Sequence, residues 1–375
     1  MRNVYVVSDN ILSPLGADTR LNMEALMNGR SGIQQHAPGI SPEPFFASLF
    51  SSAEKAGSET FTAFEQIVFD SARDAIQKSP VSLDPADKKT GFILSSTKGN
   101  IGLIENLNGE NIPVERISLN TSARLIADRL GFVQDPLVVS HACISGLLAM
   151  ITGMRLISSG LYNNLVISGA DLISSFIYSG FLSFQAISPT PCRPFDAARD
   201  GISLGEAAAT VILSAMPSAG SVQLSGGSVS NDANHISGPS RTGEELWLAI
   251  SRAMEQADTN SKEIDFISAH GTATRYNDEM EAKAFHLASL QSVPLNSLKG
   301  YYGHTLGAAG ILESIVTIHS MKKNMVLPTY GFSIPGTEMP VNVIRELKPA
   351  VLRKCLKTAS GFGGCNAALV INGSQ

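Results

Sequence analysis

The chain has 375 residues, and only 16% of them are charged, against about 25% in an average soluble protein. A surface so short of charge indicates area hidden in a subunit interface. The net charge of −5 gives no reason to expect nucleic acid or an anionic membrane as a partner, and neither a membrane span nor a leader is visible. The cysteines show no C-x-x-C pair and no metal-type spacing, which predicts a soluble, reduced, cytoplasmic protein without a metal site; they are Cys143, Cys192, Cys355 and Cys365.

The first half of the chain alternates apolar strands with amphipathic helices. Strands are expected at 3–7, 90–96, 165–169 and 207–213, and helices at 21–27, 63–77 and 122–130. Residues 30–60 are rich in Gly, Pro and Ser without a clear period and are expected to be irregular, whereas residues 171–205 are expected to be rich in loops. Residues 99–120 are ambiguous and could lie near a partner subunit.

The stretch from Leu137 to Gly160 changes its periodicity in the middle. Residues 137–140 predict a short buried strand, whereas apolar residues recur at helical intervals from Ile144 onwards. Cys143 therefore lies on the turn that leads into a helix. Unpaired N–H groups at a helix start favour negative charge, so this thiol is expected to ionise more readily than a free cysteine, whose pKa is about 8.5. The alternative is that Cys143 is simply a small buried residue.

The second half repeats this plan. Strands are expected at 222–229, 264–269, 356–360 and 367–371, and helices at 244–257, 278–289 and after the turn at 302–304. Each half has a key residue at a helix start, followed by two apolar strands. This repetition predicts a duplicated α/β fold with mainly parallel sheets and helices on both faces, divided into halves at 1–216 and 217–375.

Three segments of the second half carry candidate functional residues. His270 directly follows an expected buried strand, in S-A-H-G-T-A-T-R-Y-N-D-E-M-E-A. Lys299 and His304 are five residues apart in K-G-Y-Y-G-H-T-L-G-A-A-G, and S-G-F-G-G-C-N at 360–366 is a flexible glycine loop. A lone histidine after a strand is more often a packed core residue than a catalyst. Two histidines, each flanked by glycine and small residues, favour a functional role.

These motifs resemble those of the β-ketoacyl-acyl-carrier-protein synthases, the condensing enzymes of fatty acid and polyketide synthesis. The resemblance runs nearly end to end, and four motifs carry it in the family's order: A-C-x-S-G around Cys143, P-F-D-x-x-R-D-G-x-x-x-G-E at 194–206, H-G-T-x-T at 270–274 and K-x-x-x-G-H-x-x-G-A-A-G at 299–310. It implies a thiolase-like fold of α-β-α-β-α layers. It also implies no cofactor in the enzyme itself, because the phosphopantetheine arm arrives on the acyl carrier protein.

The resemblance further implies the catalytic roles. Cys143 would be the nucleophile that takes an acyl group from a carrier-protein thioester, His270 and His304 the catalytic pair, and Lys299 their support. Two neutral imidazole N–H groups could stabilise the enolate formed when malonyl-carrier protein loses CO2, without a metal. The backbone N–H groups of Cys143 and Ser360 match the family's oxyanion hole, in which one donor is typically worth about 3 kcal/mol.

Other matched positions have ordinary structural alternatives. Thr272 and Thr274 match residues that hydrogen-bond the phosphopantetheine arm, although small hydroxyl residues are also common in turns. Asp278 and Glu281 match acidic residues near the histidine support network, although acidic residues are also favoured near a helix start. Phe362 would line the acyl channel, or it would be a buried aromatic residue of a core.

Two departures from the family pattern concern the acyl chain. Many relatives carry a bulky aromatic residue at the position of Ser360, where it gates the acyl pocket, so the serine suggests altered gating and an unusual acyl chain. Such a chain could be unsaturated or belong to a specialised polyketide pathway. In addition, residues 99–120 look trimmed. Because this region of the family shapes the dimer contact and the pocket floor, the chain-length specificity stays open.

Several related activities remain as alternatives. A thiolase would be expected to carry a second catalytic cysteine where Ser360 stands, and an initiating synthase would pair its cysteine with a histidine and an asparagine. A non-catalytic chain-length partner would usually lack Cys143. The chain could, however, be the active half of a heterodimer with such a partner, or it could form a homodimer.

Overall fold

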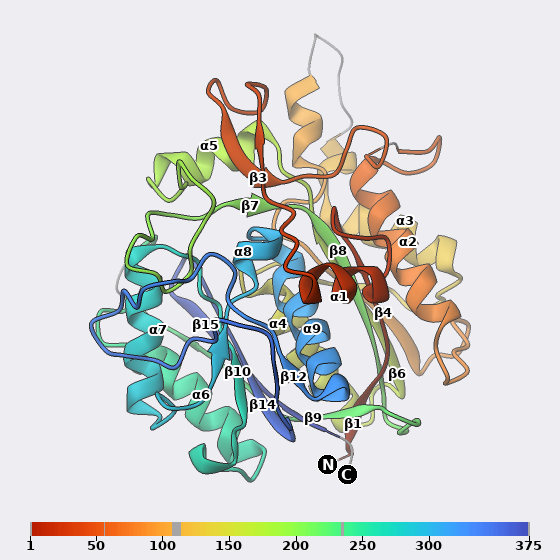
Figure 1. Ribbon diagram of the computed structural model, residues 1–375. Coiled ribbons are helices and arrows are strands. Elements are labelled where there is room, and N and C mark those ends of the chain that lie inside the picture. The colour runs from red at the N-terminus through yellow and green to blue at the C-terminus, as the bar shows by residue number, and fades with distance from the viewer. Residues whose placement is uncertain (1, 56, 107–113, 234–235, 374–375) are drawn as a thin grey trace.

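The computed structural model describes residues 2–55, 57–106, 114–233 and 236–373. Its main feature is one ten-stranded sheet with the order β11-β10-β14-β15-β9-β1-β8-β6-β4-β5 (Figure 1). In chain order these strands are β1 Val4–Leu12, β4 Thr90–Ser95, β5 Leu137–Val139, β6 Asn164–Asp171, β8 Ala207–Ser214, β9 Val222–Asn231, β10 Phe266–Ser268, β11 Leu295–Asn296, β14 Lys354–Gly361 and β15 Cys365–Asn372.

The two ends of this sheet have the same topology. When the strands of each end are numbered along the chain, both read 3-2-4-5-1 towards the centre, where β1 pairs with β9. The mixed α/β fold is thus as predicted, but within the described strands of this ten-stranded sheet the parallel pairs are confined to β5, β4 and β6 and to β11, β10 and β14. The expectation of mainly parallel pairing is wrong at the centre of the sheet. There β8 runs antiparallel to β6, and β15 runs antiparallel to β14.

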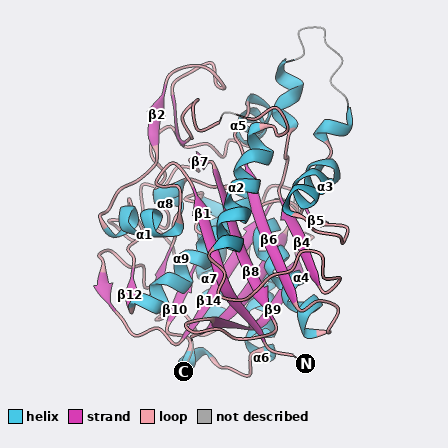
Figure 2. Ribbon diagram, turned by 90° about the vertical axis from the view of Figure 1, so that its right-hand side faces the viewer, coloured by secondary structure: helices cyan, strands magenta, loops and turns pink. Residues whose placement is uncertain are grey.

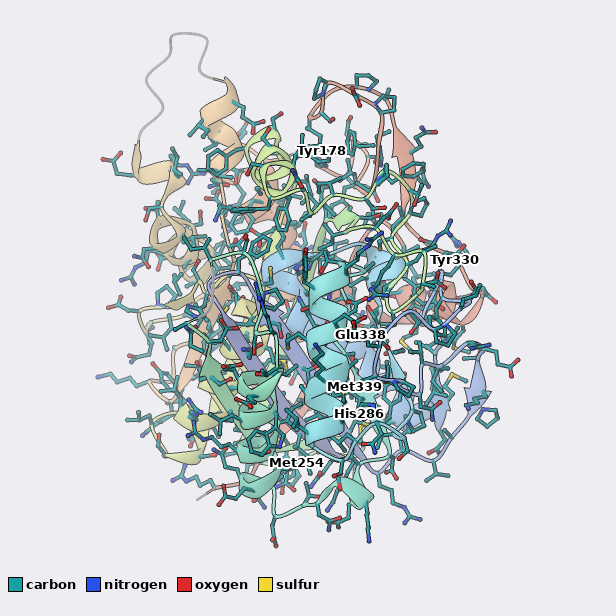
Figure 3. The ribbon with its side chains drawn as sticks, turned by 90° about the vertical axis from the view of Figure 1, so that its left-hand side faces the viewer. Tyr178, Met254, His286, Tyr330, Glu338 and Met339 are labelled. Atoms are coloured by element: carbon teal, nitrogen blue, oxygen red, sulfur yellow. The ribbon has the colours of Figure 1, made fainter. Side chains whose placement is uncertain are left out.

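Two central helices separate the two ends of the sheet. Helices α4 (Ser145–Ser158) and α9 (Ala309–Lys323) contact each other and strands of both ends (Figure 1). Helices α2 (Ala63–Gln77) and α3 (Leu119–Leu130) cover the outer face of the end formed by β5, β4, β6, β8 and β1 (Figure 2). Figure 3 shows the opposite outer face, with α6 (Glu244–Gln256) and α7 (Arg275–Leu287). The result is the expected α-β-α-β-α layering.

The central helices approach each other through glycines. A Cβ atom on Gly310 of α9 would lie 2.3 Å from the backbone nitrogen of Leu147 in α4. A Cβ atom on Gly146 of α4 would lie 2.7 Å from the carbonyl oxygen of Gly307. No side chain larger than hydrogen fits at such distances, so these glycines set how closely the starts of the two helices can lie.

Some local expectations are wrong. The segment 30–60 contains β2 (Gln34–His36) and β3 (Phe45–Ser48), which form a small sheet with β7 (Leu204–Gly205). The segment 171–205 is rich in loops, as expected, and also contains α5 (Ser175–Ser183). Strands this short have no period of their own and depend on pairing with distant residues. The remaining elements are α1 Thr19–Met27, α8 Lys299–Tyr302, β12 Met325–Val326, β13 Lys348–Pro349 and 3-10 turns at Ile101–Asn106, Val114–Ile117, Ser261–Glu263 and Leu306–Ala308.

Two further expectations concern the edge of the sheet. Strand β5 was expected to be buried, but it is the last strand of the sheet and its Leu137 is 38% exposed. Of the ambiguous segment 99–120, which looked trimmed, residues 107–113 lie outside the described part of the chain. None of the helices that the structure describes is long and apolar enough to cross a membrane.

Candidate active site

Cys143 lies on the turn between β5 and α4, as the sequence predicts, with only 7% of its surface exposed. The preceding Ala142 has φ of 46°, a conformation that is strained for a residue with a side chain. The Ser145 hydroxyl holds the turn, since it accepts from the His141 N–H at 2.7 Å and donates to the Ala142 carbonyl at 2.6 Å. The first residues of α4 thus fix the position of the thiol.

The expectation that this thiol ionises readily is wrong for the unliganded protein. Burial raises the pKa of Cys143 to about 12, and the neighbouring Cys365 acts in the same direction. The Lys299 ammonium group and the Phe362 N–H lower the pKa but do not compensate. Loss of hydration destabilises the thiolate by more than the Lys299 charge and the Phe362 N–H stabilise it. The sulfur is therefore a neutral thiol at physiological pH.

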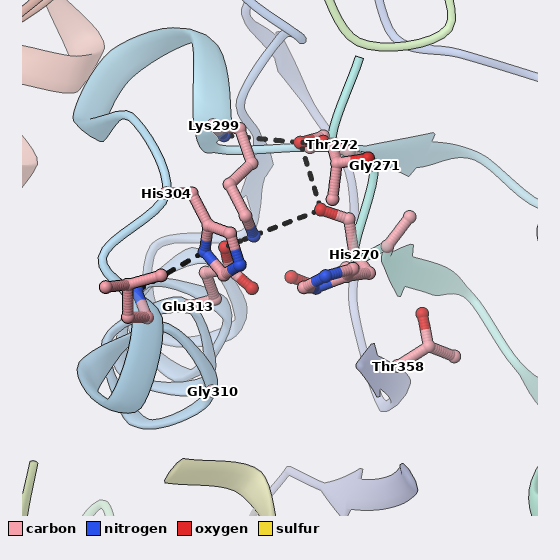
Figure 4. A network of polar contacts seen from close by, with 12 residues as sticks. His270, Gly271, Thr272, Lys299, His304, Gly310, Glu313 and Thr358 are labelled. Carbon is pink, nitrogen blue, oxygen red and sulfur yellow. Dashed lines mark hydrogen bonds and ion pairs between the residues drawn. The ribbon is translucent and has the colours of Figure 1, made fainter. Parts of the chain in front are cut away.

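His270 and His304 lie beside each other in the same cavity as Cys143. Both side chains are 1% exposed, and their ring centroids are 5.2 Å apart at an interplanar angle of 82° (Figure 4). The cavity has a volume of about 400 Å³ and is lined by all three residues. The fold thus brings together a thiol that precedes α4, a histidine that follows β10 and a histidine that precedes α9.

The hydrogen bonds of His304 define its tautomer. The Leu306 N–H donates to Nδ1 at 3.3 Å, so the proton of the neutral ring lies on Nε2. Nε2 is buried and has no hydrogen-bond partner among the described residues. Burial and the positive charges of Lys299 and Lys357 lower the pKa of both histidines well below the ordinary value. Both imidazoles are therefore uncharged, and within the described part of the chain Nε2–H of His304 is a donor without an acceptor.

Lys299 lies beside the histidine pair and holds the backbone of His270. Its ammonium group donates to the His270 carbonyl at 3.1 Å and forms a very short ion pair with Glu313 (Figure 4). The other Glu313 oxygen lies 2.6 Å from Nζ of Lys357. Sequence reasoning missed Glu313 and Lys357. The available signal was a single charge inside an otherwise apolar element, in I-L-E-S-I and C-L-K-T-A.

Asp278 and Glu281 hold the backbone of the His270 loop. Glu281 accepts from the N–H groups of His270 at 2.8 Å and Gly271 at 2.6 Å, and from the Thr358 hydroxyl at 3.0 Å. Asp278 accepts from the Thr272 N–H at 3.0 Å. Burial raises the pKa of both carboxyls, and that of Asp278 reaches about 7. Their position beside the histidine loop is more specific than a general preference for acidic residues at a helix start.

The two threonines lie on the wall of the cavity. Thr272 and Thr274 both line it, and their hydroxyl oxygens are 2.9 Å apart. The Thr274 hydroxyl also accepts a hydrogen bond from the Asn277 N–H at the start of α7. The structure therefore gives Thr274 the ordinary capping role as well as a surface on the cavity.

The glycine loop differs from expectation in one respect. Ser360 lies within β14, lines the cavity and donates its hydroxyl to Asn366 at 2.8 Å. The loop N–H that acts on the Cys143 sulfur is that of Phe362. Ser360 is paired with Asn366 in the strand ladder, two residues before Phe362. The Phe362 ring also lines the cavity and packs against Phe181 and Phe184, at centroid distances of 5.5 and 5.0 Å.

The remaining motif residues have structural partners. Asp196 accepts from the N–H groups of Ser333 and Ile334, and Arg199 donates to the Gly336 carbonyl. A G-x-S-x-G pattern at 201–205 is not a nucleophile elbow, because Ser203 is fully buried and its hydroxyl accepts from the Cys192 N–H. Among the described residues, no group of three His, Cys, Asp or Glu side chains could hold a metal ion.

Comparison with curated relatives gives consistent names. A "Putative 3-oxoacyl-[acyl-carrier-protein] synthase, mitochondrial" of Schizosaccharomyces pombe is 26% identical over 98% of both chains. A "Putative polyketide beta-ketoacyl synthase 1" of Streptomyces cyaneus is 29% identical over 90% of this chain and 85% of that protein. Among solved structures, a ketosynthase from Xenorhabdus doucetiae in complex with its chain length factor has a TM-score of 0.88, covers 100% of this chain and 98% of its own, and is 24% identical. That likeness shows the fold.

Two family models together account for most of the sequence. The model of the β-ketoacyl synthase N-terminal domain matches residues 1–219, and that of the C-terminal domain matches residues 222–333. Enzymes of this family are acyltransferases that use no cofactor of their own. The chain belongs to the β-ketoacyl synthase family.

Proposed function

We propose that the chain catalyses decarboxylative Claisen condensation and extends an acyl chain on acyl carrier protein by two carbons. The observation that carries this proposal is the meeting of the Cys143 thiol with two uncharged imidazoles in one cavity. A single nucleophile would suffice for acyl transfer. Two additional N–H donors beside it are needed only if negative charge develops at a second position.

Acyl transfer would use Cys143 and the glycine loop. The sulfur attacks the thioester carbonyl, and the N–H groups of Cys143 and Phe362 hold the oxyanion of the tetrahedral intermediate. The carbon–sulfur bond to the carrier breaks, and the carrier thiol leaves with the proton that Cys143 gives up. Thr272 and Thr274, on the cavity wall, are proposed to hydrogen-bond the phosphopantetheine arm.

Condensation would use the histidine pair. The malonyl thioester oxygen accepts from Nε2–H of His304 and from a ring N–H of His270. The bond to the carboxylate breaks, CO2 leaves, and the electron pair forms an enolate that these donors stabilise. The carbanion attacks the acyl carbonyl on Cys143. The Cys143 sulfur leaves and recovers a proton, while the β-keto thioester stays on the carrier.

The partners follow from this chemistry. Acyl and malonyl groups would arrive on acyl carrier protein, with residues 1–216 supplying the nucleophile and residues 217–375 the imidazoles. We propose a dimer in the cytoplasm. A specific alternative is a heterodimer in which this chain is the active subunit. It is supported by solved structures titled as ketosynthase and chain length factor complexes, whose fold this chain shares.

The proposal is tested by loading Cys143 from a panel of acyl-carrier proteins and detecting the product by mass spectrometry. We expect loading of the wild type, no loading of Cys143→Ala, and loading without condensation for His304→Ala. If acyl exchange to coenzyme A occurs instead of malonyl-dependent elongation, the chain is a thiolase. Measuring the solution mass of the purified chain decides between a homodimer and a subunit that needs a second protein.

A further inference from the structure

Lys357 is a fully buried lysine to which the proposed reaction assigns no role. It lies on β14, directly beside the end of β10, and its ammonium group is surrounded by oxygen atoms. It donates to the carbonyls of Thr358 at 2.8 Å, Ser268 at 3.1 Å and Ala269 at 3.3 Å. The fourth contact is the ion pair with Glu313 at 2.6 Å. These contacts hold the last residues of β10, immediately before His270.

Lys357 and Lys299 share one counterion. Lys299 binds the first Glu313 oxygen and the His270 carbonyl, and Lys357 binds the second Glu313 oxygen. Three consecutive carbonyls, of Ser268, Ala269 and His270, thus receive hydrogen bonds from two buried ammonium groups. A single lysine would already neutralise Glu313. The second one leaves this ion cluster with an excess positive charge.

We propose that Lys357 is a positioning residue of the condensing site, whose ammonium group fixes the end of β10 and supplies the positive charge that keeps the imidazoles of His270 and His304 uncharged. This inference rests on the proposed function only for its consequence in catalysis. Among the described residues, the charged or titratable groups around the histidine pair and its ion cluster are Cys143, Cys192, Asp278, Glu281, Lys299, Glu313 and Lys357, with Arg199 behind Asp278 and with Asp171 and Cys365 behind Cys143.

Only an uncharged imidazole keeps a lone pair and avoids repelling the two ammonium groups. The carboxylates of Glu281 and Glu313 act against this effect, because negative charge favours protonation of a neighbouring histidine. Without Lys357, Glu313 would still be paired with Lys299, and the net charge of the ion cluster beside the histidines would fall by one. Both histidines should then bind protons at a higher pH, so the acid limb of the condensation profile should also begin at a higher pH.

The experiment compares two substitutions that remove the charge. Lys357→Met keeps the length and the apolar stem, and Lys357→Gln keeps N–H donors for the carbonyls. Lys354→Met is the matched control, because Lys354 lies on the same strand and contacts Thr259 and Glu263 near the surface. The first readout is NMR titration of the imidazoles in the free protein, assigned with His270→Gln and His304→Gln. The second is the pH dependence of condensation, measured beside acyl loading of Cys143.

We expect the imidazole midpoints to rise by about one pH unit in Lys357→Met and Lys357→Gln, as removal of one nearby charge would cause. The acid limb of the condensation profile should move by the same amount, while acyl loading changes less than about threefold and Lys354→Met follows the wild type. Unmoved midpoints in either folded variant would overturn the inference. If the wild type forms no β-ketoacyl product, the proposed function fails, whereas the titration still decides the role of Lys357. If only Lys357→Met shows a loss and Lys357→Gln restores the wild-type midpoints, the hydrogen bonds matter and the charge does not.

Discussion

Replacement of Gly310 by alanine tests how the central helices place the reactive groups. The added Cβ would lie 2.3 Å from the Leu147 nitrogen and 2.8 Å from its Cβ, whereas ordinary contacts begin at 3.4 Å. Helices α4 and α9 would have to separate by the difference between 3.4 and 2.3 Å, roughly 1 Å. Helix propensity alone favours alanine over glycine by about 1 kcal/mol. Overpacking typically costs about 1–3 kcal/mol, so the two effects have opposite signs.

We expect overpacking to win, because the contact is with backbone atoms that cannot rotate away. Gly310→Ala should lower the free energy of unfolding by up to about 2 kcal/mol in urea titrations, the difference between the two effects. Condensation should fall by about a hundredfold, because Cys143 and His304 lie at the starts of the two helices and a 1 Å displacement has an effect of about that size. Reaction of Cys143 with acyl carrier protein should suffer less.

The control is Gly180→Ala in α5, where an added Cβ meets no atom within 4 Å. It should be neutral or stabilising by up to about 1 kcal/mol, with activity retained. If Gly310→Ala is as stable as Gly180→Ala and fully active, the glycine contact does not set the geometry of the site, and the reasoning is wrong.

Three further predictions concern the thiol, the acyl cavity and the largely buried pair of Asp9 and His319. Because burial raises the pKa of Cys143 to about 12, alkylation of this thiol by iodoacetamide should accelerate about tenfold per pH unit from pH 7 to 9. The rate is measured against Cys143→Ser, and a plateau below pH 9 would contradict the raised pKa. Ser360 lines the cavity, so Ser360→Phe should reduce loading of long acyl chains, and an acyl-chain profile identical to that of the wild type would remove the idea of an altered gate. Burial alone would raise the pKa of Asp9, but hydrogen bonds from His319 and Thr19 and the charge of His319 lower it below 3.8. A depressed carboxyl pKa stabilises the fold above the unfolded value and ceases to do so as the pH falls through the folded value. Asp9→Asn should therefore destabilise the protein at pH 7, and the difference in urea midpoint should shrink below about pH 4; a constant difference down to pH 3 would argue against the pair.

The main elements of the fold could be predicted because their apolar periods are strong. Helix α2 coincides with the expected range 63–77, and Cys143 precedes α4 as the change of period indicates. The short strands β2, β3 and β7 could not be predicted, because residues distant in the chain stabilise them. The antiparallel centre of the sheet was also missed. Strand direction depends on how the chain returns between strands, which local periodicity does not record.

For the site, the sequence indicated which of the proposed catalytic residues come together but not their electrostatics. Cys143, His270 and His304 do line one cavity. The helix start suggested an acidic thiol, whereas burial, which depends on the whole fold, raises its pKa. Glu313 and Lys357 looked like isolated charges in apolar segments and became meaningful only when α9 and β14 were seen beside Lys299.

The matching strand order of the two ends of the sheet has a consequence for how the site assembles. Helix α4 begins shortly after β5, the third strand of its end of the sheet, and α9 comes after β11, the third strand of the other end. The Cys143 sulfur and the His304 imidazole therefore lie at equivalent positions of two ends with the same topology. A fragment containing only one end would carry either the thiol or the imidazoles, and its central helix would lack the helix against which it packs. Productive folding must therefore bring both ends together before the first substrate can react, and a chain cleaved between them should regain turnover only when the pieces recombine.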